Sequence, residues 1–158
     1  MLPLPPQSPL PPRQGAAALF CLLATEAVSA GFPSPADDYV EARIDLNVEL
    51  IPRPLSTFFM RVSGDAMRGD GIVDGDLLVI DRSVDPRPGM VVVAVHAGAF
   101  LLRRLARRGT QLWLVASDGT SPPLLLSGDG GSDGGGADLW GVVIHAVHHL
   151  AGAPSRRR

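Results

Sequence analysis

The chain has 158 residues, of which 46% are apolar, and its formal net charge is -2. This length fits one domain with a tail, and the small net charge gives no global sign of a nucleic-acid-binding protein. Cys21 is the only cysteine, which excludes an intramolecular disulfide, and no apolar run approaches the roughly 20 residues that a membrane-spanning helix needs.

The amino-terminal part begins with a proline-rich stretch. Residues 1–15 contain six prolines, which predicts an extended or disordered leader. The apolar run at residues 16–24 predicts a short helix. The small residues 28–30 before Gly31 also resemble the cleavage site of a secretory signal, so a secreted β-domain with a signal peptide is one alternative. The long, poorly charged start and the nearby Glu26 count against that alternative.

From residue 57 onward, strand and turn signals alternate. Residues 57–62 are rich in β-branched and aromatic side chains, and residues 77–80 form an apolar run that follows the turn at 74–76. His96-Ala97-Gly98-Ala99 predicts a tight hairpin turn in which Gly98 adopts a positive φ. Further strands are expected at residues 90–96, 100–104, 111–116, 124–127 and 139–147, with a flexible glycine-rich loop at 128–136. The predicted fold class is mainly β, with six or seven strands in a curved, partly barrel-like sheet.

One motif points to a known family. Ser63-Gly64-Asp65-Ala66-Met67, followed by Asp74-Gly75-Asp76, resembles the Ser-Gly-Asp-Ser-Met signature of the LexA/UmuD self-cleaving serine peptidases. Residues 31–41, 43–47 and 140–145 resemble UmuD in particular, and the resemblance covers about residues 28–150. Because no recognisable helix-turn-helix segment accompanies it, the UmuD branch is favoured over the repressor branch. The resemblance implies a LexA/UmuD-type peptidase domain with a short N-terminal arm.

The resemblance also implies a Ser–Lys dyad that cuts the protein's own arm at a small-Gly bond, which here is Ala30-Gly31. Such a dyad needs a hydroxyl nucleophile and a lysine whose pKa is lowered enough by burial for the amine to accept a proton. In this sequence Ala66 stands at the position of the serine and Arg103 at that of the lysine. Alanine has no hydroxyl, and arginine stays protonated because its pKa is above about 12. The sequence therefore predicts a pseudo-protease that cannot cleave itself.

An active serine peptidase of the same family with a relocated nucleophile is the second alternative. Ser63 is the nearest candidate, but it matches the first serine of the signature, which is not the nucleophile in the family. Ser63 and Ala66 are also expected to point in different directions if a strand ends at residue 62. A change at Ala66 alone could be an engineered trap, whereas its combination with Arg103 favours a naturally inactive protein.

By resemblance, the predicted function is that of a UmuD-like, cytoplasmic accessory factor in the SOS response to DNA damage. A homodimer or a mixed dimer with a relative is expected, with a Y-family translesion DNA polymerase and the RecA filament as partners. Neither direct sequence-specific DNA binding nor membrane binding is predicted. The predicted division is a leader and arm over residues 1–37, a peptidase-like domain over 38–152 and a basic tail over 153–158.

The remaining polar and aromatic residues predict no cofactor and no metal site. The four histidines, at positions 96, 145, 148 and 149, lack convergent ligand spacing and are interpreted as surface or half-buried residues. Asp74 and Asp76 are interpreted as parts of a strand-entry turn rather than as an acid–base pair. Trp113 and Trp140 are predicted to be core or dimer-interface aromatics.

Overall fold

The computed structural model describes residues 9–12, 20–24, 41–127 and 135–151. They divide into two units. One unit contains residues 9–12 together with the described residues from 55 onward, and the other contains the described residues between 20 and 54. Most of the glycine-rich loop expected at 128–136 lies outside the described residues, as does the basic tail.

The smaller unit is built on a pair of strands. β1 (Phe20–Ala24) pairs antiparallel with β2 (Glu41–Asp45), and the short helix α1 (Leu46–Leu50) follows directly. Asp45 caps this helix, since its carboxylate accepts a 2.9 Å hydrogen bond from the Asn47 amide. The helix expected at residues 16–24 is wrong for residues 20–24. A short apolar run fits a strand as well as a helix, and the pairing with β2 decides between them.

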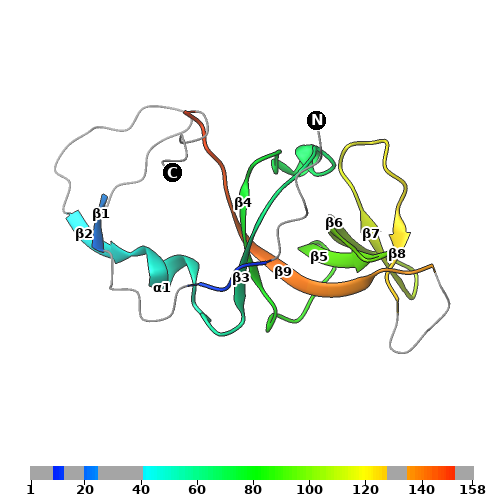
Figure 1. Ribbon diagram of the computed structural model, residues 1–158, viewed down its shortest axis with the longest axis horizontal. Helices are drawn as coiled ribbons and strands as arrows, with labels where there is room; N and C mark the ends of the chain where they lie inside the picture. Colours follow the sequence, from blue (N-terminus) through cyan, green and yellow to red (C-terminus); the bar gives the residue numbers. More distant parts are fainter. Residues whose placement is uncertain (1–8, 13–19, 25–40, 128–134, 152–158) are drawn as a thin grey trace. The chain divides into compact units, whose positions relative to one another are not determined.

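The larger unit contains a seven-stranded antiparallel sheet in the order β3-β4-β9-β5-β6-β7-β8 (Figure 1). Its strands are β3 (Thr57–Arg61), β4 (Leu77–Asp81), β5 (Val91–His96), β6 (Ala99–Arg108), β7 (Gln111–Val115), β8 (Leu124–Leu125) and β9 (Asp138–Val147). A 3₁₀ turn, η1 (Arg68–Asp70), lies between β3 and β4. The predicted mainly β class is confirmed. The sheet is open, however, with β3 and β8 as its two edges.

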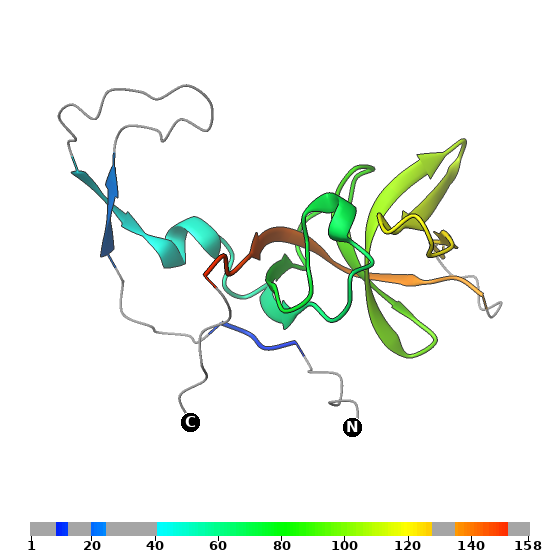
Figure 2. The same cartoon turned by 90° about the horizontal axis from the view of Figure 1, so that it is seen from above.

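The last strand, β9, joins the two parts of this sheet. It pairs with β4 along its carboxyl-terminal half and with β5 along its amino-terminal half, and Figure 2 shows it running between them. Gly141 lies where the two pairings meet, and a Cβ atom there would come within 2.7 Å of Ile80 Cγ2. A residue without a side chain therefore allows β9 to approach β4 closely at this point.

The turn between β5 and β6 has the geometry expected of a tight hairpin. Ala97 and Gly98 both have positive φ values, 48° and 77°. Two consecutive residues of positive φ are the mark of a type I′ turn, whose twist matches that of the flanking strands. The prediction for Gly98 is confirmed, and this turn sets the register in which Val92 lies opposite Arg103.

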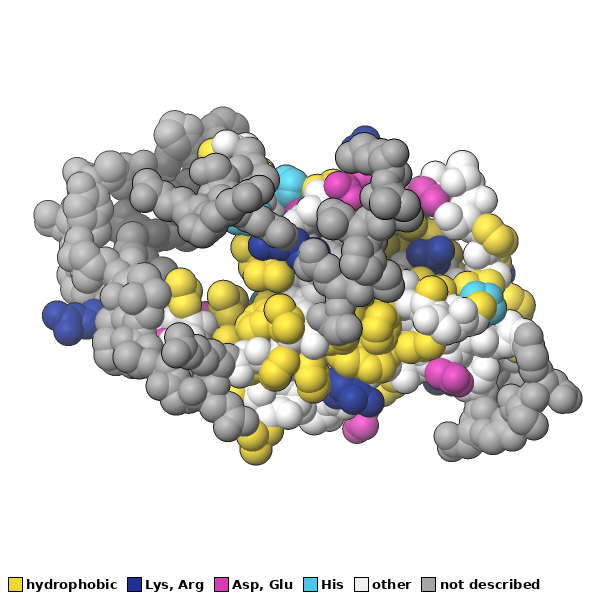
Figure 3. Space-filling model, in the orientation of Figure 1, with side chains coloured by type: hydrophobic (Ala, Val, Ile, Leu, Met, Phe, Trp, Pro, Cys, Tyr) yellow, Lys and Arg dark blue, Asp and Glu magenta, His cyan; other side chains and the backbone are white. Residues whose placement is uncertain are grey.

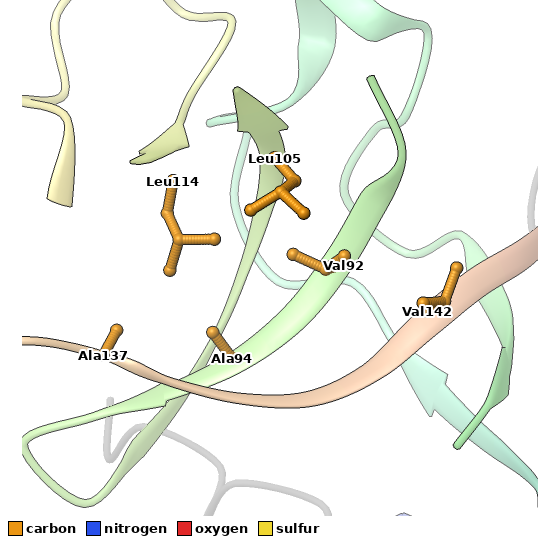
Figure 4. Packing of buried hydrophobic residues seen from close by; sticks show 6 residues of the cluster. All are labelled: Val92, Ala94, Leu105, Leu114, Ala137 and Val142. Atoms are coloured by element: carbon orange, nitrogen blue, oxygen red, sulfur yellow. The ribbon is translucent and has the colours of Figure 1, made fainter. Parts of the chain in front are cut away.

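Two groups of buried side chains form the core of the larger unit. One contains Val92, Ala94, Leu105, Leu114, Ala137 and Val142, and in Figure 4 the side chains of Val92, Leu105 and Leu114 converge. The other contains Met67, Ile72, Leu78, Ile80 and Val93. Val92 and Val93 are consecutive residues of β5, so the two groups lie on opposite faces of that strand.

Aromatic side chains of β3, β6 and β9 meet around Trp140, which also packs against the second group. Apolar side chains gather near the middle of the face shown in Figure 3. The Trp140 ring makes edge contacts with Phe58 and Phe100, whose centroids are 5.4 and 5.3 Å away. The Arg82 guanidinium lies 4.9 Å from the Trp140 ring centre and donates a hydrogen bond to the Trp140 carbonyl. Trp140 is half-buried, and its contacts join side chains of several strands.

Among the described residues, no helix has the length and apolar character needed to cross a membrane.

The buried position of Leu105 leads to a test of the core. Leu105→Ala removes a side chain that is 0% exposed, and its neighbours belong to three other strands. We expect the free energy of unfolding to fall by about 2–5 kcal/mol in chemical denaturation. Leu125→Ala, on the short edge strand and 37% exposed, is the control and should cost less than about 1 kcal/mol. Equal losses in the two variants would contradict this description of the core.

Candidate functional site

The segment that carries the family signature follows β3 and is shaped by backbone hydrogen bonds. Gly64 has a φ of 91°, and its amide donates a 2.7 Å hydrogen bond to the Asp74 carboxylate. The chain then turns at Asp65, whose carbonyl accepts from the Arg68 amide at 3.1 Å, and enters η1. The interpretation of Asp74 as a turn residue agrees with this contact, since its carboxylate holds the signature loop.

Met67 anchors this loop in the core. Its side chain is 2% exposed and packs with Ile72, Leu78, Ile80 and Val93. Its carbonyl accepts hydrogen bonds from the amides of Asp70 and Ile72. The neighbouring Ala66 is half-buried, so the position predicted for the nucleophile lies beside a fixed hydrophobic anchor.

The residue that holds Ala66 from the other side is Ser117, which follows β7. Its amide donates a 2.8 Å hydrogen bond to the Ala66 carbonyl, and its hydroxyl accepts one of 3.1 Å from the Asp70 amide. Gly69 lies so close to it that a Cβ there would be 2.4 Å from the Ser117 carbonyl oxygen. Sequence reasoning did not single out Ser117, because it belongs to no motif and lies 51 positions after Ala66.

Arg103, at the position predicted for the lysine, lies in β6 and is half-buried. Its Nη1 donates a 2.7 Å hydrogen bond to the carbonyl of Leu102. Its Nε, however, is buried without a hydrogen-bond partner among the described residues. Among the described residues, the hydrogen-bonding capacity of this guanidinium is therefore satisfied only in part.

The neighbouring Arg104 makes an ion pair, whereas Arg103 makes none with the described residues. Its Nε and Nη2 lie 3.0 and 2.5 Å from Asp70 Oδ1, and Nη1 also donates to the Gly89 carbonyl. Because Asp70 closes η1, this contact connects the signature loop to β6. Sequence reasoning missed it, since the two residues are 34 positions apart and Arg104 lies in a run of arginines that is typical of a solvated face.

The two predicted site positions therefore lie on elements that touch. Ala66 is bonded to Ser117, and β7, which ends two residues before Ser117, pairs with β6 up to Arg104. Arg103 immediately precedes Arg104 in β6. The other predicted functional residues, Ala30 and Gly31 of the cleavage bond, lie outside the described residues.

Positions 66 and 103 do not carry the side chains of a Ser–Lys pair. Ala66 offers a methyl group, and Ser63, the alternative nucleophile, is exposed on the loop before it. The 14 basic residues counted in the sequence are all arginines, so the chain contains no lysine that could replace Arg103 as a base. A Ser–Lys dyad is therefore excluded anywhere in this chain.

A second polar contact lies at the start of β4, where Asp76 meets His148. Asp76 is 2% exposed, and its carboxylate lies 2.6 Å from His148 Nδ1 and accepts a hydrogen bond from the Val73 amide. Burial raises the pKa of Asp76, but the hydrogen bonds from Val73 and His148 and the nearby histidine charges outweigh it, so that the pKa is lowered. This pair connects the end of β9 to the turn before β4. In the described part of the chain, no group of three or more potential ligands is placed to hold a metal ion.

Comparison with known proteins finds a matching family and several curated relatives. A family model described as Peptidase S24-like matches residues 22–137. Protein ImpA of Salmonella typhimurium is 40% identical over 119 residues, which cover 75% of this chain and 77% of the relative. Protein SamA of Salmonella typhimurium strain LT2 is 45% identical over 105 residues, or 66% and 70% of the two chains. Protein MucA of Escherichia coli is 37% identical over 120 residues, or 76% and 79%.

The Arg104–Asp70 contact can be tested by its effect on the signature loop. Arg104→Met removes the hydrogen bonds to Asp70 and Gly89, so we expect the free energy of unfolding to fall by about 1–3 kcal/mol. The Ser117 amide should also exchange faster with solvent, because its acceptor, Ala66, lies on the loop that Asp70 holds. Arg107→Met, an exposed position on the same strand, is the control and should change neither quantity. Unchanged exchange at Ser117 in Arg104→Met would show that the loop does not depend on this ion pair.

Proposed function

We propose, from the premise that this chain is a UmuD-like member of the Peptidase S24-like family, that it acts as an accessory factor which has kept the family fold and lost self-cleavage. The observation that carries the proposal is the side chain at position 66. Ala66 has no oxygen for attack on a carbonyl, and the absence of lysine from the whole chain leaves the family's general base without a substitute.

Arg103 does not restore this chemistry. A guanidinium has only hydrogen-bond donors and no acceptor, so it cannot take a proton from a hydroxyl. The Nε of Arg103 is buried and has no hydrogen-bond partner among the described residues. This supports the inference that the surroundings of position 103 suit a different side chain. An arginine adapted to a new role is instead expected to have its donors satisfied, as those of Arg104 are by Asp70 and Gly89.

The features that do not serve cleavage are intact. The loop after β3 is still anchored by Met67 and bonded to Ser117, so loss of the nucleophile has left its backbone support in place. A fold kept without its chemistry supports a role in binding. By family resemblance, we infer a role in the SOS response to DNA damage, as a cytoplasmic homodimer or a mixed dimer with an active relative.

The inferred partners are a Y-family translesion DNA polymerase and the RecA filament. The net charge of -2 supports contacts with proteins over sequence-specific contacts with DNA. In a mixed dimer, an active relative is the inferred agent that cuts the bond Ala30-Gly31, for which this chain supplies small residues on both sides but no catalytic groups.

The absence of self-cleavage is tested by prolonged incubation at alkaline pH. At about pH 10 a dyad lysine with a lowered pKa is largely neutral and can act as a base. A relative that has an intact Ser–Lys pair is therefore expected to cut itself readily under these conditions. The present chain should stay full length in the same buffer. Mass spectrometry of a highly pure sample provides the measurement, and a fragment that begins at Gly31 would contradict the proposal.

Restoration of the dyad provides a second test. Ala66→Ser combined with Arg103→Lys should produce a fragment that begins at Gly31, while each single change should produce none, because nucleophile and base act as a unit. Addition of Ser63→Ala to the double variant is the matched control and should leave the cutting unchanged. If the double variant is folded by circular dichroism and stays uncut, the cleft has changed at more than these two positions, which would contradict a site that is intact apart from its dyad.

A further inference from the structure

The outer edge of β3 is occupied by residues 9–12, a described part of the chain's own proline-rich leader. Leu10 and Phe59 form an isolated antiparallel bridge, in which the Leu10 amide donates to the Phe59 carbonyl at 3.1 Å and the Phe59 amide donates to the Leu10 carbonyl at 2.7 Å. Residues 9–12 are the dark blue segment beside β3 in Figure 1. The bridge depends on backbone groups, because the Leu10 side chain is 65% exposed.

Residues 9–12 cover the edge of β3 without offering a full new edge of their own, and we call this segment the cap. Leu10 is the only residue of 9–12 with an amide hydrogen, since Pro9, Pro11 and Pro12 have none. In an extended segment the backbone N–H and C=O groups of Leu10 point toward β3, and the backbone groups of Pro9 and Pro11 point away from it. The outer side of the leader therefore presents no donor at these two positions to which another strand could bind.

The strand under this cap has the properties of a reactive edge. β3 reads Thr-Phe-Phe-Met-Arg, with no proline, no lysine and a single charge at its end. Exposed edges of this kind pair readily with other strands unless they are short, charged or covered. The opposite edge, β8, has only two residues and is protected by its length.

The sequence of β3 is complementary to itself. If two copies pair antiparallel about Phe59, each Phe59 lies opposite the Phe59 of the second copy and can exchange with it the same two hydrogen bonds that Leu10 supplies here. Phe58 then lies opposite Met60, and Thr57 opposite Arg61, so that apolar side chains meet and like charges do not. A two-fold pair has this self-complementary form.

We propose that the outer edge of β3 is a docking site for β3 of a second copy of this chain, and that residues 9–12 cover it in the intact protein. The leader lies on the amino side of Ala30-Gly31. Removal of residues 1–30 would therefore uncover the edge, a consequence that rests on the proposed cleavage in trans. The edge itself does not depend on cleavage, and its pairing is additional to any other dimer contact.

The test uses the full-length chain and a change that removes one amide hydrogen. Leu10→Pro eliminates the Leu10 donor, while Leu10→Ala keeps it and shortens only an exposed side chain. In dilute solution, the Phe59 amide of Leu10→Pro should exchange at least about tenfold faster than in wild type, as measured by nuclear magnetic resonance. At higher concentration, the mass of Leu10→Pro in analytical ultracentrifugation should double relative to wild type, and Leu10→Ala should match wild type.

Two further measurements identify the paired surface. Phe59→Pro on the Leu10→Pro background removes the outward amide of β3 and should return the mass to the wild-type value, while Phe59→Leu should not. An excess of the synthetic peptide Ser-Pro-Leu-Pro-Pro should also return the mass of Leu10→Pro to the wild-type value. Unchanged Phe59 exchange in Leu10→Pro would overturn the cap. Faster exchange with an unchanged mass would overturn self-pairing and assign the edge to a segment of another protein.

Discussion

The dual pairing of β9 is the constraint on which the larger unit depends. A single ten-residue strand bonds to β4 over one half and to β5 over the other, and therefore joins two groups of strands that have no other neighbour in common. This arrangement needs a close approach at Gly141, where Ile80 occupies the space of a side chain. The signature loop extends from β3, on one side of β9, while β6 and β7 lie on the other side.

The signature loop contacts β6 and the segment after β7 through two polar contacts. The Ala66 carbonyl bonds to the Ser117 amide, and Asp70 is held by Arg104. These contacts do not depend on the residue type at position 66 or 103. The backbone and a neighbouring ion pair therefore maintain the geometry around positions 66 and 103, whichever side chains stand there.

The two edges of the open sheet are each protected from pairing with further strands. β8 ends after two residues, and β3 is covered by a segment in which three of four residues are prolines. Both arrangements limit the addition of further strands. The second can be reversed, because the cap is a short segment held by two backbone hydrogen bonds, and its Leu10 side chain is largely exposed.

The sequence by itself determined the strands of the larger unit, the turn at Gly98 and the absence of any lysine from the chain. These features depend on local alternation, on a backbone conformation that glycine adopts easily, and on side-chain chemistry that no fold can supply. Only the tertiary structure decided that residues 20–24 form a strand, that Ser117 supports Ala66, and that Arg104 pairs with Asp70 and Leu10 with Phe59. Each of these outcomes depends on a partner far along the chain. Strand register brings such partners together, and a local pattern contains no information about them.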